Sequence, residues 1–513
     1  MKKFYVLAVL TVLVISLSAQ SVVLSEPYKN LWAYRPTLNT TPIGQDDTYN
    51  YYFVHDRSVQ GFKPKNYTDH LYIVNKKSMQ KAADVAVTVS NKHGFLGGVN
   101  SDKDVYGLYE SLPGKGEMIL FTIVDLGKKS RSFTLTDDIS VSTAANPKFW
   151  PEFKTAKSPD GKLLAALAVV TGKDSRLENL FAVVINDQGE FVWSGEINPQ
   201  FGGKTFSLGN LAVDNEGNVY LPTYTCQVSG KTISNVQFMM VRANANGSAS
   251  FTEDVTFGTP QNFTSKVLAN GEVAVAGYYT DSKTTTATQT SGYYFYRFDT
   301  KSESIADIQS FEFSDGYVEK TVWARFSNEL GNQQYSVSAD NIFELEDGSL
   351  VLCGEHRFVK SVYNQQMNST TYQMLTKNIL VSTLRPDGSA SFTMIEKQQS
   401  SAQYAVPGDD WRPNCISYTA FPHHNDMYFL FSDDPKNIPY PGKGVVCAPG
   451  GLSYKDSWTN VLMRLTPDQK ITQRVINDPK QLLRSVDFVD DECFVATGIG
   501  KSELFLNKYM IEE

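Results

Sequence analysis

A strand–turn–strand pattern recurs along most of the chain, and this repeat restricts the fold more than any other feature. In residues 266–277 (KVLANGEVAVAG) and 343–354 (FELEDGSLVLCG), two strand-like runs flank a turn built from Asn, Asp or Gly. Such residues tolerate a left-handed backbone φ, so each segment predicts a tight β-hairpin. The pattern recurs in residues 87–98, 157–168, 212–223, 422–432 and 486–498.

Each of these hairpins is followed by a second one, and two hairpins together make a four-stranded unit. The second hairpins are predicted at residues 118–135, 179–193, 236–251, 293–308, 378–395 and 461–475. The units begin near residues 83, 153, 207, 263, 338 and 414, at intervals of roughly 50 to 65 residues that suit propeller repeats. The sequence therefore predicts an all-β chain folded as a β-propeller of four-stranded antiparallel blades.

The C-terminal residues 482–511 supply only three strands, so closing the ring requires a strand from elsewhere. Residues 49–54 (YNYYFV) and 70–74 (HLYIV) are both strand-like, and we predict that the N-terminal region completes the last blade. Without such a strand, two blades would expose unpaired edges. This count favours seven blades. Eight remain open, because residues 21–80 contain more strand material than one strand needs.

The turn sequences resemble those of a known group of proteins. Residues 214–220 (DNEGNVY) and 385–389 (RPDGS) resemble the repeats of secreted bacterial propellers of the SBBP-like kind, and more widely the kelch-like and quinoprotein-like propeller superfamily. The resemblance implies the fold and carries no activity. A Gly-Gly pair typical of kelch strands occurs only at Gly97-Gly98, and the tryptophan-docking motif of quinoproteins does not repeat, so no quinone cofactor is expected.

The N-terminus has the layout of a secretory signal peptide. A basic Met1-Lys2-Lys3 precedes an uncharged apolar run over residues 4–17, and Ser18-Ala19-Gln20 supplies small residues before a cleavage site. An N-terminal anchor helix is the alternative. We predict a signal peptide over residues 1–20, a segment over 21–81 that contributes the closing strand, and the propeller over 82–513. The mature chain is then exported to the periplasm, the outer surface or the medium, without a later transmembrane segment.

Composition limits the partners and cofactors. The formal net charge of −8 argues against a nucleic acid bound through its phosphates. The first of the five cysteines is Cys226, so a lipoprotein anchor near the cleavage site is not expected, and no Cys-x-x-Cys pair suggests a metal site. An oxidising compartment would permit a disulfide between Cys415 and Cys447, which flank one long loop. We expect neither a metal nor a cofactor; the oligomeric state stays open.

Long connections are predicted on one face only. In a propeller the tight turns of every hairpin lie on one face, and the connections between hairpins and between blades lie on the other. The long ones are predicted at residues 280–292, 328–335, 356–377, 399–413 and 433–460, in the units that begin near 263, 338 and 414. Loops on a rigid scaffold commonly bind partners. The candidate binding residues are Glu355, His356, Tyr363, Tyr372, Trp411, Arg412, Tyr440, Tyr454 and Trp458.

These observations favour a non-catalytic exported propeller that binds a protein or glycan partner through these loops. The alternative interpretation of the aromatic residues is that they pack the long loops against one another. An alternative function is a hydrolase acting on a polysaccharide or peptide, because paired carboxylates can catalyse such reactions. Its candidate carboxylates are Glu355, Asp409, Asp410, Asp433 and Asp434. A structural subunit of an envelope complex is the third hypothesis. No catalytic residue is assigned.

Overall fold

The fold is described from a computed structural model of the 513-residue chain. The residues that it describes are 20–23, 39–60, 63–87, 93–101, 104–111, 118–124, 129–134, 152–171, 177–199, 201, 204–284, 290–313, 336–364, 369–400, 417–441, 447, 458–476, 482–499 and 504–511. These residues form antiparallel β-strands and a short 3-10 helix, η2 (Pro435–Asn437).

The strands of the described residues form eight sheets, each built on a path of four strands. Blade 1 contains β2 (Asn39–Gln45), β3 (Tyr49–Gln60), β4 (Lys63–Asn75) and β5 (Lys81–Val87). Blade 2 contains β6 (His93–Ser101), β7 (Asp104–Ser111), β8 (Met118–Val124) and β9 (Lys129–Thr134). Blade 3 contains β10 (Glu152–Lys157), β11 (Leu163–Thr171), β12 (Leu177–Asn186) and β13 (Phe191–Ile197). Blade 4 contains β14 (Thr205–Leu208), β15 (Ala212–Val213), β16 (Val219–Ser229), β17 (Thr232–Asn244) and β18 (Gly247–Asp254).

Blades 5 to 7 continue the same order along the chain. Blade 5 contains β19 (Thr259–Val267), β20 (Val273–Thr280), β21 (Gly292–Asp299) and β22 (Ser304–Glu312). Blade 6 contains β23 (Ser336–Glu344), β24 (Leu350–Asn364), β25 (Ser369–Leu384), β26 (Ala390–Ile395) and β27 (Gln399–Ser400). Blade 7 contains β28 (Tyr418–His423), β29 (Asp426–Asp433), β30 (Thr459–Leu465) and β31 (Ile471–Ile476). The last sheet, blade 8, joins β1 (Gln20–Val23) to β32 (Leu482–Val489), β33 (Cys493–Ile499) and β34 (Leu504–Met510).

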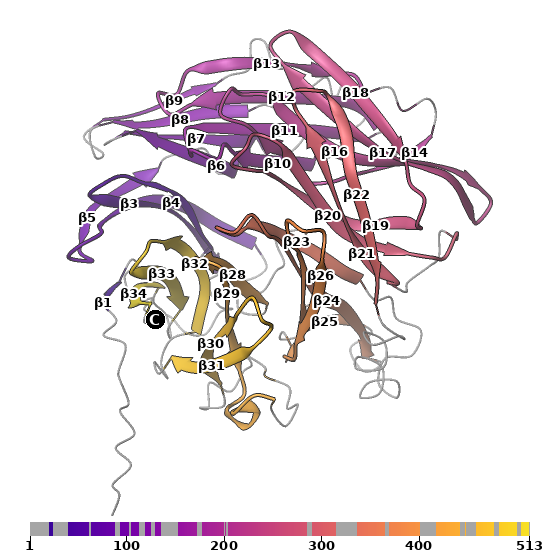
Figure 1. Ribbon diagram of the computed structural model, residues 1–513. Helices are drawn as coiled ribbons and strands as arrows, with labels where there is room; N and C mark the ends of the chain where they lie inside the picture. The colour runs from indigo at the N-terminus through magenta and orange to yellow at the C-terminus, as the bar shows by residue number, and fades with distance from the viewer. Residues whose placement is uncertain are drawn as a thin grey trace, which may run out of the picture.

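The sheets close into a ring, which confirms the predicted propeller (Figure 1). Inner strands of successive blades contact one another, as β2 contacts β6 and β19 contacts β23. Blades 8 and 1 meet through a buried apolar cluster that includes Tyr52, Val74 and Leu506. Seven blades therefore use consecutive strands, and one composite blade fastens the ring. The repeats recognised in the sequence correspond to blades 2 to 8. Blade 1 lies in the N-terminal region whose surplus strand material left an eighth blade open.

The closing strand comes from the N-terminal region, as predicted, but from a different segment. β1 forms the outer edge of blade 8, where Gln20 pairs with Lys508 and Val23 with Phe505 (Figure 1). The predicted closing segments 49–54 and 70–74 lie instead in β3 and β4, which pair with each other inside blade 1. Their side chains over Tyr51–Val54 and Leu71–Val74 are buried. A continuous apolar run suits a central strand that is covered on both faces, whereas an outer strand needs no such run.

Most of the predicted hairpins are confirmed, with one exception. Residues 266–277 form the β19–β20 hairpin and residues 343–354 form the β23–β24 hairpin. Residues 87–98 do not form a hairpin, because β5 is the outer strand of blade 1 and β6 is the inner strand of blade 2. The turn chemistry of this segment is correct for a hairpin, but each strand finds its partner elsewhere: β5 pairs with β4, and β6 with β7.

The two faces of the ring differ in how the strands are joined. On one face, which we call the short-turn face, the described connections are tight turns, such as those at residues 158–161, 268–271 and 345–348. Gly161, Gly271 and Gly348 adopt positive φ there (72°, 86° and 81°), as such turns require. Side chains brace neighbouring turns: Asp160 N donates to Asn215 Oδ1 at 3.1 Å, and Ala269 N donates to Glu344 Oε2 at 2.8 Å. The turns of neighbouring blades are therefore joined by hydrogen bonds on this face.

Removal of β1 is expected to destabilise the ring. A mature chain that begins at Leu24 loses the four-residue pairing with β34 and leaves β34 as an open edge. We expect its free energy of unfolding to fall by about 2 kcal/mol, since each backbone hydrogen bond contributes about 0.5–1.5 kcal/mol. Urea unfolding of this chain beside one that begins at Gln20 measures the difference. Equal midpoints with equal slopes would contradict the closing role of β1.

Candidate functional site

The second face, which we call the elaborated face, carries the connections between the second and third strands of each blade. Two of the predicted long connections are present there: β20 ends at Thr280 and β21 begins at Gly292, and β29 ends at Asp433 and β30 begins at Thr459. The units in which long loops were predicted are blades 5 to 7. Residues 328–335 and 401–413 lie outside the described residues, and Gln399–Ser400 form the short strand β27.

The predicted loop at residues 356–377 is an extended hairpin instead. β24 and β25 continue past the blade, and their pairing runs from Arg357–Thr376 out to Asn364–Ser369. The residues of this extension, RFVKSVYN and STTYQM, are rich in β-branched and aromatic types that favour strands. The polar residues between them made the segment resemble a loop. Blade 4 has a similar extension over β16 and β17, where Ile233 N donates to Lys283 O of blade 5 at 2.8 Å.

The predicted binding residues are distributed between surface and core. Tyr363, on the β24–β25 extension, is the most exposed large hydrophobic side chain of the described residues, at 57%. Tyr440 is half-buried against the core of blades 6 and 7, and Trp458 is also half-buried. Glu355 and His356 are buried in β24. Tyr372 lies in β25, opposite Ser361. Trp411, Arg412 and Tyr454 lie outside the described residues.

Glu355 is the centre of a buried ion network. Its side chain is 0% exposed and contacts the ammonium of Lys397, which is also 0% exposed. Arg357 Nε donates to Glu355 Oε2 at 2.8 Å, and its Nη2 lies 3.0 Å from Asp340 Oδ1. Ser417 Oγ donates to Glu355 Oε2 at 2.8 Å. Burial raises the pKa of Glu355, but Lys397 and Arg357 outweigh it, so the pKa is lowered and the carboxylate is ionised.

The same network fixes the bases of three connections on the elaborated face. Gln399 Oε1 accepts hydrogen bonds from Lys397 Nζ, Thr376 Oγ1 and Ser417 N at 3.1, 3.1 and 2.6 Å. Gln399 Nε2 donates to Ser432 O at 2.6 Å. These groups come from the β24–β25 extension, from the segment after β26, from the start of blade 7 and from the end of β29. The extension and the connections beside it are therefore held by one polar cluster, which we call the Glu355 cluster (Asp340, Glu355, Arg357, Thr376, Lys397, Gln399 and Ser417).

The described candidate carboxylates of a hydrolase are engaged in structural contacts. Glu355 is ion-paired as described above. Asp433 is 2% exposed, and its Oδ1 accepts hydrogen bonds from Asp434 N and Asn437 Nδ2 at 2.8 and 2.7 Å. Asp434 caps η2 through a hydrogen bond from Lys436 N at 2.9 Å. Asp409 and Asp410 lie outside the described residues.

Cys447 is the described member of the predicted cysteine pair. Cys447 is buried, and burial followed by the nearby Asp433 raises the pKa of its thiol well above the usual value. Cys415 lies outside the described residues, so its pairing with Cys447 stays a prediction. Within the described part of the chain, three or more His, Cys, Asp or Glu side chains do not gather in a way that could hold a metal ion. The Asp side chains of the turns bond their own backbone, as Asp214 Oδ1 does with Glu216 N and Asn218 N.

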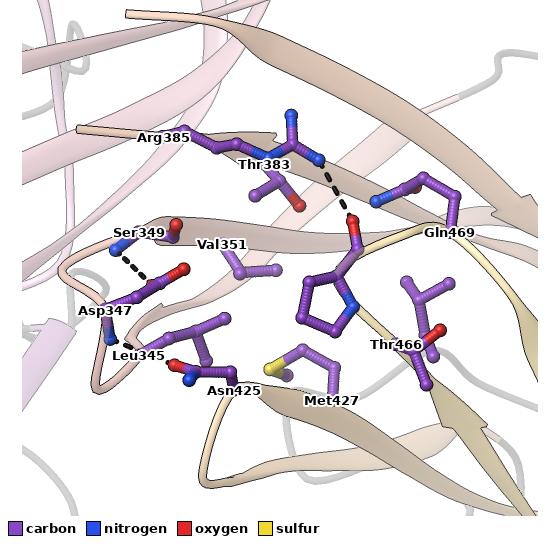
Figure 2. Close-up of a pocket in the computed structure, with 12 residues that line it drawn as sticks. Leu345, Asp347, Ser349, Val351, Thr383, Arg385, Asn425, Met427, Thr466 and Gln469 are labelled. Atoms are coloured by element: carbon purple, nitrogen blue, oxygen red, sulfur yellow. Dashed lines mark hydrogen bonds between the residues drawn. The ribbon is translucent and has the colours of Figure 1, made fainter. Parts of the chain in front are cut away.

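A small pocket opens on the short-turn face between blades 6 and 7 (Figure 2). Its apolar lining includes Leu345, Val351 and Met427, and its polar rim is used for bracing. Arg385 Nη2 donates to Pro467 O at 3.1 Å, and Asp347 N donates to Asn425 Oδ1 at 2.9 Å (Figure 2). The pocket is thus part of the seam between two blades, and no residue predicted for binding lines it.

Sequence reasoning missed the partners of Glu355. Asp340, Arg357, Lys397, Gln399 and Ser417 were not among the predicted site residues. One signal was present, because Glu355-His356-Arg357 interrupts the apolar strand LVLCGEHRFV. Charged residues inside such a run are rarely buried unless they are paired. The sequence could not show that Lys397 is the partner of Glu355, because Lys397 lies in the segment after β26 and Glu355 lies in β24.

Comparison with known proteins gives only distant structural matches. No family model matches the chain, and no curated protein matches it. A streptogramin B lyase structure matches with 10% identity over 83% of this chain and 96% of that one, at a TM-score of 0.33. The polysaccharide lyase Uly1 matches with 10% identity over 84% and 93%, at 0.37. The β-propeller domain of the Trilobed protease from Pyrococcus furiosus matches with 9% identity over 87% and 97%, at 0.36. TM-scores this low carry no argument, and the propeller fold rests on the sheet topology described above.

Among the described residues, no helix has both the length and the apolar composition that a bilayer crossing needs.

Proposed function

We propose that the chain is an exported, non-catalytic propeller that binds a protein or glycan partner through the elaborated face of blades 5 to 7. The observation that carries this proposal is the contrast between the faces. The short turns of blades 6 and 7 brace one another, as Asp347 N does with Asn425 Oδ1, whereas their opposite ends carry the β24–β25 extension and the connection after Asp433. Rigid scaffolds with elaborated connections on one face commonly bind there.

Two features of the elaborated face support binding. Tyr363 projects from the β24–β25 extension with 57% of its surface exposed, and tyrosine supplies large contact area at low entropic cost. The Glu355 cluster holds the base of this extension with buried hydrogen bonds, so that the tyrosine is presented from a fixed element. Preorganised contacts lose less entropy on binding.

The described carboxylates favour binding over hydrolysis. Glu355 forms a buried ion pair with Lys397. Asp433 accepts buried hydrogen bonds, and Asp434 caps the helix η2. A general acid or nucleophile must instead reach its substrate. A structural subunit of an envelope complex would differ from such a binding protein only in that its complex with the partner is permanent. Co-purification of the two proteins in a fixed stoichiometry would identify this case.

Export remains part of the proposal. β1 begins at Gln20, the last residue of the predicted signal peptide. Cleavage after Ala19 would leave the whole closing strand in the mature chain, and N-terminal sequencing of the secreted protein tests this.

Binding is tested by comparing Tyr363→Ala with the control Phe191→Ala. Phe191 is an exposed aromatic residue (47%) at the start of β13, which follows a tight turn on the short-turn face. Each variant and the wild type are immobilised and offered solubilised envelope proteins and a glycan array. We expect Tyr363→Ala to reduce binding of the captured partner by at least about tenfold, as expected when a central aromatic contact is removed. Phe191→Ala should bind normally.

Three outcomes would contradict the proposal. Equal binding by all three chains would place the interface elsewhere, and loss in Phe191→Ala alone would place it on the short-turn face. Failure of the wild type to bind any protein or glycan would remove the binding function.

A further inference from the structure

Asp433 is a buried carboxylate whose hydrogen-bond donors are neutral. It ends β29 and is 2% exposed. Its Oδ1 accepts from the backbone N of Asp434 at 2.8 Å and from Nδ2 of Asn437 at 2.7 Å. Both hydrogen bonds use one oxygen, so a protonated, uncharged Asp433 keeps them. The negative charge is therefore not required for these contacts, and burial makes it costly.

The charged groups around Asp433 do not compensate its charge fully. Among the described residues, the charged groups that face it are Lys397 from the segment after β26 and Asp434 from its own connection, and the uncharged Cys447 thiol lies near them. The Lys397 ammonium is already bonded to Glu355, Thr376 Oγ1 and Gln399 Oε1. The guanidinium of Arg357 is ion-paired with Glu355 and Asp340. Two cations thus stand among four carboxylates, which leaves an excess of negative charge in this buried group.

Asp433 begins a segment that docks on blades 6 and 7. Asn437 is 6% exposed, and its backbone N donates to Asp434 O at 2.8 Å. Tyr440 N donates to Gln473 Oε1 at 2.8 Å, and its hydroxyl donates to Met394 O at 3.3 Å. The segment therefore depends on Asp433 at one end and on contacts to β31 and β26 at the other.

We propose that Asp433 is a proton-linked anchor: protonated, it holds the segment 433–441 against blades 6 and 7, and on ionisation it weakens this docking. Burial raises the pKa of Asp433 to about 6, although the hydrogen bonds from Asn437 and Asp434 oppose the shift. A carboxyl group whose docked pKa is raised binds its proton more tightly when docked, so docking is favoured at low pH and weakens as pH rises through about 6.

The size of the effect follows from the two pKa values. With an ordinary pKa of 3.8 after undocking and about 6 when docked, the equilibrium constant for undocking rises about tenfold between about pH 5 and pH 7.5. This inference concerns the segment itself and does not depend on the proposed binding function.

Hydrogen exchange tests the proposal on the full mature chain. Protection factors of a peptide covering residues 434–441 are measured at several pH values between 5 and 7.5 and corrected for the intrinsic pH dependence of exchange. We expect protection in the wild type to fall about tenfold as the pH rises. Asp433→Asn keeps an oxygen acceptor without a titrating group, so its protection should vary less than about twofold. The control Asp434→Asn keeps the cap of η2 and should show the wild-type fall.

The decisive results are distinct. Constant protection in the wild type, or an unchanged fall in Asp433→Asn, would overturn the proposal. If Asp433→Asn does not fold, the wild-type profile still decides, because the proposal requires the fall to bend near pH 6 and any profile without that bend contradicts it.

Discussion

Replacement of Glu355 by alanine is expected to lower the free energy of unfolding by about 3–5 kcal/mol. The change leaves the ammonium of Lys397, which is 0% exposed, without its carboxylate partner, and it also removes one of the two carboxylates that contact Arg357. Removal of one member of a buried pair is strongly destabilising, because the remaining charge has lost both water and partner. Chemical unfolding monitored by circular dichroism measures the loss.

Two further variants separate the buried charge from a general effect of losing an ion pair. Glu303→Ala breaks the pair with Arg242, whose two side chains are 42% and 26% exposed, and it should cost less than about 1 kcal/mol. Combining Glu355→Met with Lys397→Met removes both buried charges, and it should recover much of the stability lost in Glu355→Ala. A small loss in Glu355→Ala, similar to that of Glu303→Ala, would show that the Glu355 cluster is not energetically important.

The propeller could be predicted from the sequence because its repeat is local. Residues 266–277 contain the turn, both strands and the apolar pattern of a hairpin, and the structure confirms that hairpin. Ring closure is not local. The closing strand QSVV is short and has no pattern of its own, whereas β3 and β4 are the more obvious strands and belong inside blade 1. Residues 87–98 fail for the same reason, since their turn residues say nothing about which strand each half will pair with.

The candidate site was predicted less well, for a physical reason. The side of the ring that carries long connections follows from the alternation of turns, and the connections after Thr280 and Asp433 are present. The contacts between these connections could not be predicted in the same way. Ser417 reaches Glu355 because blades 6 and 7 are neighbours in the ring, whereas Lys397 reaches it from the segment that follows β26 of blade 6 itself. The sequence shows that residue 355 is acidic, but it does not show which basic side chain pairs with it.

Mild acid is expected to destabilise the protein through His356. The imidazole is 4% exposed, and its Nδ1 has no hydrogen-bond partner among the described residues. Burial, followed by the positive charge of Lys377, lowers the pKa of His356 to about 4. An unfolded chain binds a proton at this residue near pH 6.5, whereas the folded chain resists protonation down to about pH 4. The contribution is therefore complete above about pH 6.5 and is lost progressively as the pH falls toward 4.

The expected loss from His356 is about 3 kcal/mol between pH 7 and pH 4, since one pKa unit corresponds to about 1.4 kcal/mol. Asp433 titrates in the opposite sense over part of this range, because its pKa is raised, so the two are separated by mutation. His356→Gln removes the titrating group and should flatten the dependence of the unfolding free energy on pH by about 3 kcal/mol. His423→Gln, which alters the histidine that ends β28 on the short-turn face, is the control variant. A variant His356→Gln that loses as much stability in acid as the wild type would mean that the acid sensitivity arises at other groups.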